Sequence, residues 1–127
     1  MTGAHAKPRI LIVDDETRMA KAMARLLTHR YQVTLASSAR LALELLDGGG
    51  EFDGIVCDLM MPEMTGMELY ERLHAIRPSL AERTIFMTGG AYTEEAQEFL
   101  ARFPERRLDK PFHPEELDRV LGLALKG

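Results

Sequence analysis

The sequence predicts an α/β protein built on one doubly wound parallel sheet, and three observations favour this class. Short apolar runs alternate five times with segments whose apolar residues recur at helical spacing, the pattern of (βα)₅ units. The length of 127 residues fits a single domain. A content of 46% hydrophobic and 28% charged residues is typical of a globular chain rather than a disordered one.

Each expected strand is a short, mostly branched or aromatic run that ends in polar or turn residues. The five runs are 9–15, 31–36, 52–60, 83–90 and 106–112. The solidly apolar stretches 10–13, 54–57 and 84–87 should lie inside the sheet, because inner parallel strands are buried on both faces. The more polar stretches 31–36 and 106–110 should form its edges. This gives the strand order 2-1-3-4-5.

Each expected helix has a start or stop signal beside its apolar face. The expected helices cover residues 17–30, 38–47, 65–77, 93–103 and 114 onward. Ser38, Thr65 and Thr93 stand where these helices begin, and Thr65 with Glu68 has the form of a capping box. Glycines follow the second helix and prolines follow the third and fourth, as helix ends often require. The last helix begins with Pro114, which suits a first helical position.

Charge and cysteine content limit the class of protein. A net charge of −4 and a pI near 5.6 argue against nucleic-acid binding, which needs a basic surface. The single cysteine, Cys57, excludes an internal disulfide and favours a reducing, cytoplasmic compartment. No apolar run suggests a membrane span or a signal peptide. We expect a flexible N-terminal lead-in at 1–7 and one domain at 8–127.

Acidic residues follow two of the inner strands. In ILIVDDE (10–16), four branched apolar residues run into three acids, and Asp58 follows the third strand. Ligands of open α/β sheets bind at the carboxyl ends of the strands, so Asp14, Asp15 and Asp58 should converge there. Their mutual repulsion would raise a pKa unless a hard cation such as Mg²⁺ binds. The alternative is that Asp14 and Asp15 only cap the first helix and Asp58 only opens a loop.

The ends of the fourth and fifth strands add a hydroxyl and an ammonium group to the same edge. Thr88-Gly89-Gly90 could bind an oxyanion through its hydroxyl and backbone N–H groups, although the same residues also suit a plain turn. Lys110 could pair with Asp58 or with a phosphoryl group on it, although it could also be a solvated surface lysine. Cys57 should point to the opposite side of its strand, into the core.

Together these residues resemble the receiver domain of two-component response regulators over essentially the whole chain. The matching positions are Asp14-Asp15, the run Asp58-Leu59-Met60-Met61-Pro62-x-Met64-x-Gly66, Thr88 and Lys110-Pro111-Phe112. The resemblance implies a flavodoxin-like fold and a cis bond between Lys110 and Pro111. The M-T-G-G end of the fourth strand is also similar to receivers of hybrid histidine kinases.

The resemblance also implies a mechanism. Asp58 would accept a phosphoryl group from the phosphohistidine of a histidine kinase or a histidine phosphotransfer protein. The implied ligands of Mg²⁺ (or Mn²⁺) are Asp14, Asp15, Asp58 and the backbone carbonyl of Met60. The implied phosphoryl contacts are Lys110, the Thr88 hydroxyl and backbone N–H groups near Met60 and Gly89. Such a domain is not an enzyme in the ordinary sense, but it assists its own phosphotransfer and dephosphorylation.

Signal output should depend on the face built from the helix at 93–103, the strand at 106–112 and the last helix. Thr88 would move towards the phosphoryl group and change this face, which would bind an output protein or domain. Arg107 stands where the family usually has an aromatic switch residue. It should pair with Glu95 or Glu98 and move with Thr88, or be a solvated arginine without a signalling role. The protein should be a monomer or a weak homodimer.

Three other functions fit the sequence less well. A pseudo-receiver that binds proteins without phosphorylation is the main alternative, because Arg107 departs from the family pattern. A haloacid-dehalogenase-type phosphatase would need an acid two residues after Asp58, where Met60 stands.

Met60 and Gly90 offer no side chain that could orient a hydrolytic water, so an aspartyl phosphate should be long-lived. Flavin binding is disfavoured because no phosphate-binding loop follows the first strand.

Overall fold

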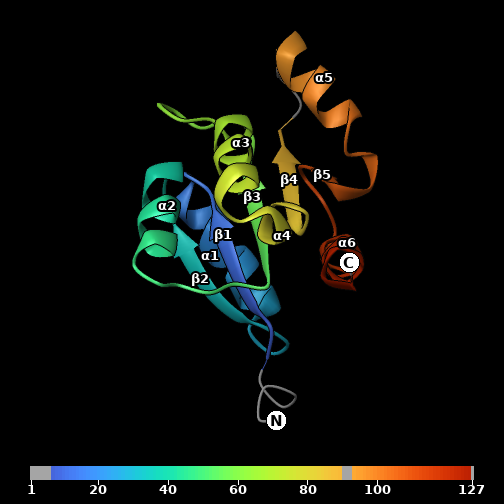
Figure 1. Cartoon of the computed structure of the whole chain (residues 1–127). Coiled ribbons are helices and arrows are strands. Elements are labelled where there is room, and N and C mark those ends of the chain that lie inside the picture. The colour runs from blue at the N-terminus through green and yellow to red at the C-terminus, as the bar shows by residue number, and fades with distance from the viewer. Residues whose placement is uncertain (1–6, 90–92, 127) are drawn as a thin grey trace.

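Five parallel strands form a single sheet in the computed structural model, which describes residues 7–89 and 93–126 (Figure 1). The strands are β1 (Arg9–Val13), β2 (Gln32–Ala36), β3 (Gly54–Asp58), β4 (Thr84–Thr88) and β5 (Arg107–Asp109). Their order is β2-β1-β3-β4-β5, and every pair is parallel. The predicted α/β class, strand order and edge strands are therefore confirmed.

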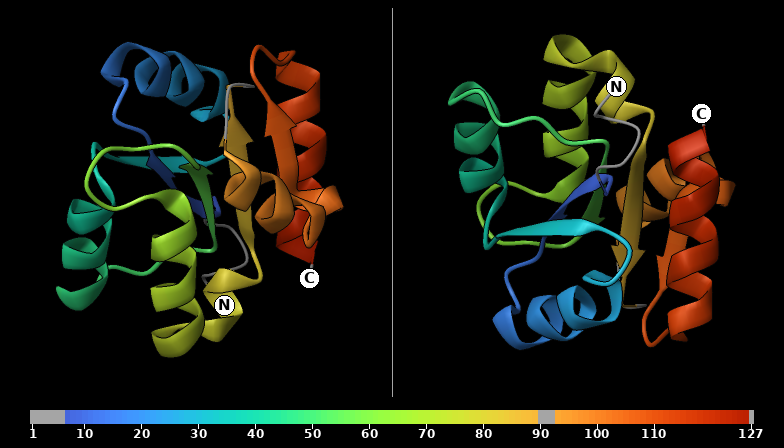
Figure 2. Two further views of the ribbon diagram at one scale, coloured as in Figure 1. Left: turned by 90° about the horizontal axis from the view of Figure 1, so that it is seen from above. Right: turned by 90° about the horizontal axis from the view of Figure 1, so that it is seen from below.

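Helices cover both faces of this sheet (Figure 2). The helices are α1 (Thr17–Leu27), α2 (Ala39–Asp47), α3 (Gly66–Ile76), α4 (Pro78–Ala81), α5 (Glu94–Ala101) and α6 (Pro114–Lys126), with a 3₁₀ turn, η2, at Pro104–Arg106. Side chains of α1 and α6 share one core with Ile10, Ile12 and Ile85, and those of α2, α3 and α5 share the other with Leu11, Ile55 and Phe86. Alternate residues of each strand thus enter opposite cores, as the two-residue period of a strand requires.

The predicted helix starts are confirmed by their side-chain hydrogen bonds. The Ser38 hydroxyl accepts a bond from the Leu41 N–H at 3.1 Å, and the Thr93 hydroxyl accepts one from the Ala96 N–H, also at 3.1 Å. At the start of α3, the Glu68 N–H donates to the Thr65 hydroxyl, and the Thr65 N–H donates to the Glu68 carboxylate. This reciprocal pair satisfies two backbone donors that the helix itself leaves unpaired.

The structure differs from the sequence prediction at several helices. Pro78 ends α3 as predicted, but it also begins the short helix α4, which the apolar pattern did not indicate. The expected fourth and fifth helices are therefore α5 and α6, and α1 ends at Leu27 rather than near Arg30. Leu41 and Leu45 of α2, counted on the apolar face of that helix, have exposed fractions of 41% and 37%.

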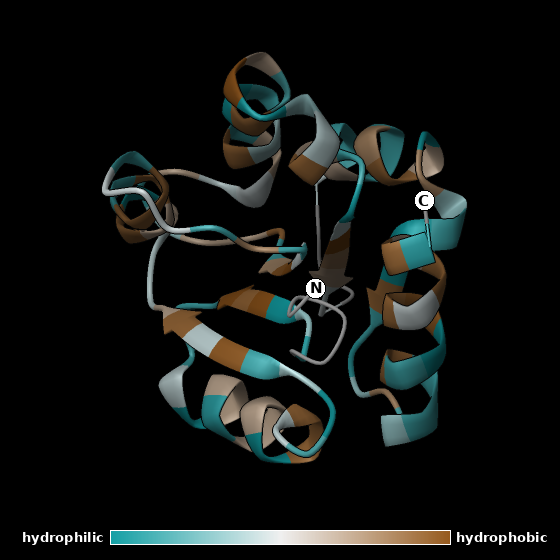
Figure 3. Ribbon diagram, turned by 60° about the horizontal axis from the view of Figure 1, so that its bottom comes forward, coloured by the Kyte–Doolittle hydropathy of each residue, from teal (hydrophilic) through white to brown (hydrophobic). Residues whose placement is uncertain are grey.

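Apolar residues gather in the strands (Figure 3). The four last residues of β1 and all residues of β3 and β4 are buried, whereas β2 is mostly exposed and β5 buries only Leu108. Cys57 lies in the core beside α2 and α3, as predicted, and burial together with the charges of Asp58 and Asp14 raises the pKa of its thiol. Within the described ranges, 7–89 and 93–126, no helix is both long and apolar enough to cross a bilayer.

The predicted N-terminal lead-in lies mostly outside the described residues, which begin at Lys7. The Lys7 ammonium donates a hydrogen bond to the Thr28 carbonyl at 2.9 Å. Pro8 accepts one from the Gln32 N–H at 2.9 Å, so the chain is attached to β2 from this point on. The boundary between lead-in and domain stays a prediction.

Candidate functional site

The candidate site lies at the carboxyl ends of β1, β3, β4 and β5. Parallel pairing aligns these ends: Asp58 lies opposite Met87, and Thr88 lies opposite Asp109, the residue before Lys110. The Lys110 N–H donates to the Thr88 carbonyl at 2.8 Å, which extends the pairing of β4 and β5 by one step. The Lys110–Pro111 peptide bond is cis, as the family resemblance implied. Side chains separated by up to 96 residues thus meet at one edge of the sheet.

Asp14 is the most buried acid of the site, with an exposed fraction of 1%. Its backbone N–H donates to the Ala36 carbonyl at 3.1 Å, and its Oδ1 accepts from the Glu16 N–H at 2.9 Å. Its Oδ2 has no hydrogen-bond partner among the described residues. The residue that caps α1 is Glu16, without a side-chain cap bond. Asp14 therefore does not act as the helix cap, and it keeps one buried oxygen available for a cation.

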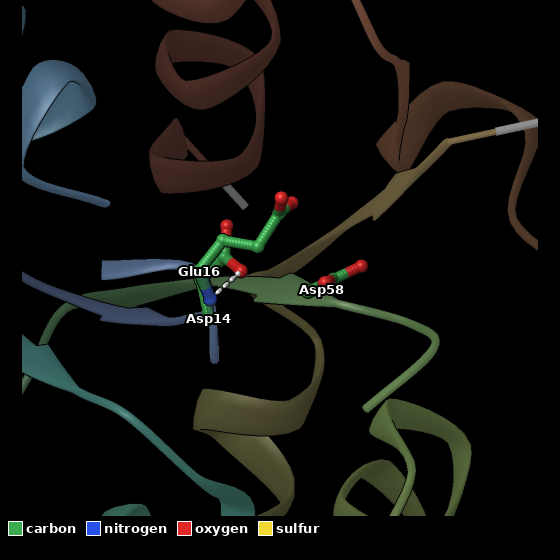
Figure 4. Close-up of side chains that lie close together, drawn as sticks. All are labelled: Asp14, Glu16 and Asp58. Atoms are coloured by element: carbon green, nitrogen blue, oxygen red, sulfur yellow. Dashed lines mark hydrogen bonds between the residues drawn. The ribbon is translucent and has the colours of Figure 1, made fainter. Parts of the chain in front are cut away.

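Glu16 completes an acidic group that the sequence analysis did not assign. One carboxylate oxygen each from Asp14, Glu16 and Asp58 lie within 4.8 Å of one another (Figure 4). The signal was present, because Glu16 is the third acid of the run after β1, but a run of acids does not reveal which carboxylates lie near Asp58. Asp15 is exposed and does not belong to this group. Its predicted metal role stays a prediction.

Lys110 pairs with all three of these carboxylates. Its Nζ lies 3.6 Å from Asp14 Oδ2, 3.5 Å from Glu16 Oε1 and 3.6 Å from Asp58 Oδ2. Burial disfavours the ammonium, but attraction to Asp58, Asp14 and Glu16 outweighs this effect and raises the pKa of Lys110. The side chain is 12% exposed, so this is not a solvated surface lysine. One fixed positive charge therefore offsets part of the negative charge of the group.

The Asp58 carboxyl group is destabilised in its ionised form. Its exposed fraction is 6%, and its pKa is raised from 3.8 to about 6. Burial is the main cause of this rise. The Lys110 ammonium lowers the pKa, the charge of Asp14 raises it, and a hydrogen bond from the Met60 backbone lowers it. Repulsion between the acids, the cause expected from the sequence, is real but secondary to burial. At neutral pH Asp58 is mostly a carboxylate, held in an environment that favours a partner for its charge.

The residues predicted to contact a phosphoryl group lie at the same edge of the sheet as this carboxylate. Thr88 is fully buried at the end of β4, and its carbonyl accepts the bond from Lys110. At Gly89 a Cβ atom would meet nothing within 4 Å, so the backbone there faces open space. Met60 is 37% exposed beside Asp58. Gly90, predicted to lie near the approach of water, is outside the described residues. The structure thus brings Thr88, Gly89, Met60 and Lys110 to one edge with Asp58.

The loop from β3 to α3 depends on two unusual backbone positions. A Cβ atom on Gly66 would lie 2.5 Å from the Asp58 carbonyl oxygen and 2.9 Å from Leu59 Cα, so only glycine fits there. The Gly66 N–H donates to the Leu59 carbonyl at 2.9 Å, which holds the loop closed behind Asp58. Glu63, in the middle of this loop, has φ of 66°, a left-handed conformation that a non-glycine residue rarely adopts.

Arg107 does not make the ion pair predicted for it. Its Nε donates to Asp109 Oδ1 at 2.9 Å, within the same strand. Among the described residues its ion pair runs to Asp109 and not to Glu95 or Glu98. Residues i and i+2 of a strand point to the same side, so the two side chains lose little conformational entropy when they form this contact. The movement of Arg107 with Thr88 during switching stays a prediction.

The fold and the site define a class of protein: a doubly wound α/β domain with an acidic, lysine-paired centre at its switch point. The family model of the response regulator receiver domain matches residues 10–121. The chain therefore belongs to the receiver domain family of two-component signalling, whose members interact with histidine kinases and output domains.

Three comparisons illustrate this relationship. The two-component response regulator ORR11 of Oryza sativa subsp. indica is 30% identical over 124 residues, 97% of this chain and 84% of that protein. The sensor kinase CckA of Brucella abortus is 36% identical over 110 residues, 85% of this chain but only 11% of the kinase. A CheY-like response regulator receiver domain protein from Methanospirillum hungatei superposes with a TM-score of 0.82 at 30% identity, covering 95% of each chain.

Proposed function

We propose that this receiver accepts a phosphoryl group on Asp58 and thereby acts as a switch in two-component signalling. The observation that carries the proposal is the environment of Asp58: a carboxylate with a raised pKa of about 6, with the Lys110 ammonium 3.6 Å away. Family membership and the similarity to ORR11 support the same role. A buried carboxylate whose charge the Lys110 ammonium offsets only in part at neutral pH is suited to react with, and be neutralised by, an electrophile.

The transfer would be a simple displacement at phosphorus. A carboxylate oxygen of Asp58 forms the new O–P bond while the P–N bond of a phosphohistidine breaks, and the electron pair leaves with the imidazole of the partner. No oxidant or further reactant is needed. With a pKa of about 6, Asp58 is ionised at pH 7 and can attack without a separate base. Lys110 would bind the transferred oxygens, and the Thr88 hydroxyl would be drawn towards them.

The acidic group fits a divalent cation. Asp14 Oδ2 is buried and accepts no hydrogen bond from the described residues; together with the oxygens of Glu16 and Asp58 within 4.8 Å it forms the hard oxygen donor set that Mg²⁺ or Mn²⁺ prefers. The family resemblance adds Asp15 and the Met60 carbonyl as ligands. When bound, the ion neutralises charge on the transferring phosphoryl group. Binding would also relieve the repulsion that Asp14 exerts on Asp58.

The site would signal through the end of the sheet. Lys110 and Thr88 are joined by a backbone hydrogen bond of 2.8 Å, so a shift of either residue is passed to β5. The surface formed by α5, β5 and α6 would then change for an output protein or domain. The phosphodonor would be a histidine kinase or a phosphotransfer protein, and a cytoplasmic location is part of the proposal. The domain would assist its own phosphotransfer and hydrolysis rather than turn over a separate substrate.

Intact mass after incubation with acetyl phosphate and Mg²⁺ tests this function. We expect one added phosphoryl group on the wild type and on Glu51→Gln, a control at an exposed acid outside the site. Asp58→Asn and the wild type in EDTA should gain none. Thermal unfolding with and without Mg²⁺ gives a readout independent of phosphorylation, and Asp14→Asn should lose the shift. An adduct of equal extent on Asp58→Asn would refute Asp58 as the acceptor. No adduct on the wild type would favour the pseudo-receiver.

A further inference from the structure

The outer side of β2 is an open edge of the sheet. β2 is the last strand on its side, and no strand among the described residues pairs with its outer side (Figure 1). The Ala36 carbonyl accepts a hydrogen bond from the Asp14 N–H at 3.1 Å, so it points towards β1. Alternate residues of a parallel strand direct their backbone groups to the same neighbour, so Val33 and Leu35 direct theirs outward. These two residues therefore offer two N–H donors and two carbonyl acceptors to another strand.

β2 lacks the features that usually protect an exposed edge from pairing. Exposed edge strands commonly carry charged side chains, a proline or a bulge. The segment 31–39 contains no charged residue and no proline, and β2 pairs with β1 in continuous register from Gln32 to Ala36. The chain as a whole carries a net charge of −4. Two copies can nevertheless approach each other along this strand without like charges facing one another.

Exposed leucines lie on both faces of the sheet beside this edge. Leu35 shares the α1 face with Val33, which packs against the core there. On the other face, α2 lies against β1, β2 and α3. Leu43 packs against the core on one flank of α2, and Leu41 and Leu45 lie on the opposite flank. Because the β2-α2-β3 crossover is right-handed, that opposite flank faces the β2 edge. Three of the seven large apolar side chains exposed within residues 7–89 and 93–126 thus surround one strand.

The open edge is complementary to a second copy of itself. In an antiparallel arrangement with a twofold axis at Thr34, Val33 of each copy lies opposite Leu35 of the other. The backbone groups of both residues point outward, so each of the two pairs exchanges two N–H···O hydrogen bonds. The two Thr34 residues then form the close pair at the axis that makes no backbone hydrogen bond, with Cα atoms about 4.5 Å apart. Thr34 is exposed, and threonines favour each other across a pair of strands.

We propose that two copies of this chain form a twofold dimer through their β2 edges, which joins the two sheets into one and covers the leucines beside the edge. A second copy fits better than a foreign peptide, because the strand is complementary to itself and carries no charge pattern that would select another partner. β5 forms the opposite edge of the sheet, so the surface of α5, β5 and α6 stays free in this dimer. The dimer does not depend on phosphorylation.

Sedimentation equilibrium of the unphosphorylated protein tests the proposal. We expect a monomer–dimer equilibrium with a micromolar Kd that does not weaken at high salt, because charges do not hold the dimer together. Thr34→Lys places two ammonium groups opposite each other at the axis, and Thr34→Glu places two carboxylates there, so each variant should raise Kd at least about fivefold. An equal mixture of the two variants should dimerise again, since opposite charges then face each other. Ser79→Lys, the matched control at an exposed position on α4, should keep the wild-type Kd.

Several outcomes would overturn the proposal. These are a wild type that stays monomeric at millimolar concentration, equal Kd values for the Thr34 variants and the wild type, and a mixture of the two variants that does not associate. A dimer that Leu123→Ser on α6 abolishes and Thr34→Lys leaves intact would assign dimerisation to the other edge of the sheet. A monomeric wild type that binds a labelled YQVTLAS peptide would assign the β2 edge to an extended peptide instead. Thr34→Lys should be labelled by acetyl phosphate to the wild-type extent, so its loss of dimerisation reports on the edge and not on the acidic site.

Discussion

Replacing Asp58 by asparagine should stabilise the folded protein at neutral pH. The side chain keeps its shape but loses a charge that the fold disfavours, because burial raises the pKa of Asp58 from 3.8 to about 6. Lys110 is not left unpaired in the variant, since it also lies 3.6 Å from Asp14 and 3.5 Å from Glu16. The residue expected to carry the function is thus expected to cost stability, as functional sites often do.

The magnitude follows from the difference between the two pKa values. At about 1.4 kcal/mol for each pKa unit, the gap between 3.8 and about 6 corresponds to roughly 3 kcal/mol. Solvent at the edge of the sheet screens part of this cost, and the lost pairing with Lys110 offsets another part. We therefore expect Asp58→Asn to raise the free energy of unfolding by about 1–2 kcal/mol at neutral pH.

The dependence on pH distinguishes this cause from better packing. A carboxyl group with a higher pKa in the folded state binds its proton more tightly when folded, so its ionisation favours unfolding. The cost is absent below pH 3.8, grows between pH 3.8 and about 6, and is complete above that range. The advantage of the variant should therefore fall to about half at pH 5.

Urea denaturation of the wild type, Asp58→Asn and Glu51→Gln at neutral pH and at about pH 5 measures these differences in the free energy of unfolding. Glu51 is an exposed acid outside the site, and its variant should unfold like the wild type at each pH. A stabilisation by Asp58→Asn that is equal at both pH values would refute the electrostatic reasoning. So would a destabilisation at neutral pH, which would mean that the ion pair with Lys110 outweighs the burial of the charge.

Four further substitutions test the surroundings of the site and one helix start. Gly66→Ala should lower the free energy of unfolding by about 2–3 kcal/mol, because the new Cβ would lie 2.5 Å from the Asp58 carbonyl oxygen; a loss below 1 kcal/mol in urea denaturation would contradict this. Glu63→Gly should raise it by about 0.5–1 kcal/mol in the same assay, by relieving the left-handed φ of 66°. Lys110→Met should raise the pKa of Asp58 further in an NMR titration, since the ammonium lowers it; an unchanged pKa would refute that contribution. Thr93→Ala should cost about 1 kcal/mol through the lost cap of α5, and an unchanged melting curve would show that the cap contributes nothing.

The sequence alone determined the fold and the edge of the sheet at which the candidate site lies. Solid apolar runs at 10–13, 54–57 and 84–87 were sufficient to identify the inner strands, and polar runs identified the edges. The strand order then placed Asp58 and Lys110 together, because the carboxyl ends of parallel strands share one edge. These deductions succeeded because a strand that is buried on both faces consists almost entirely of apolar residues.

Only the tertiary structure decided how individual side chains are used. It brought Glu16 into one cluster with Asp14 and Asp58, paired Glu16 with Lys110 and Arg107 with Asp109, and left Leu45 exposed. Periodicity gives the apolar face of a helix but not its rotation against the sheet, and a run of acids does not give the loop that orients it. Burial is the main cause of the raised pKa of Asp58, and burial exists only once distant segments of the chain have packed together.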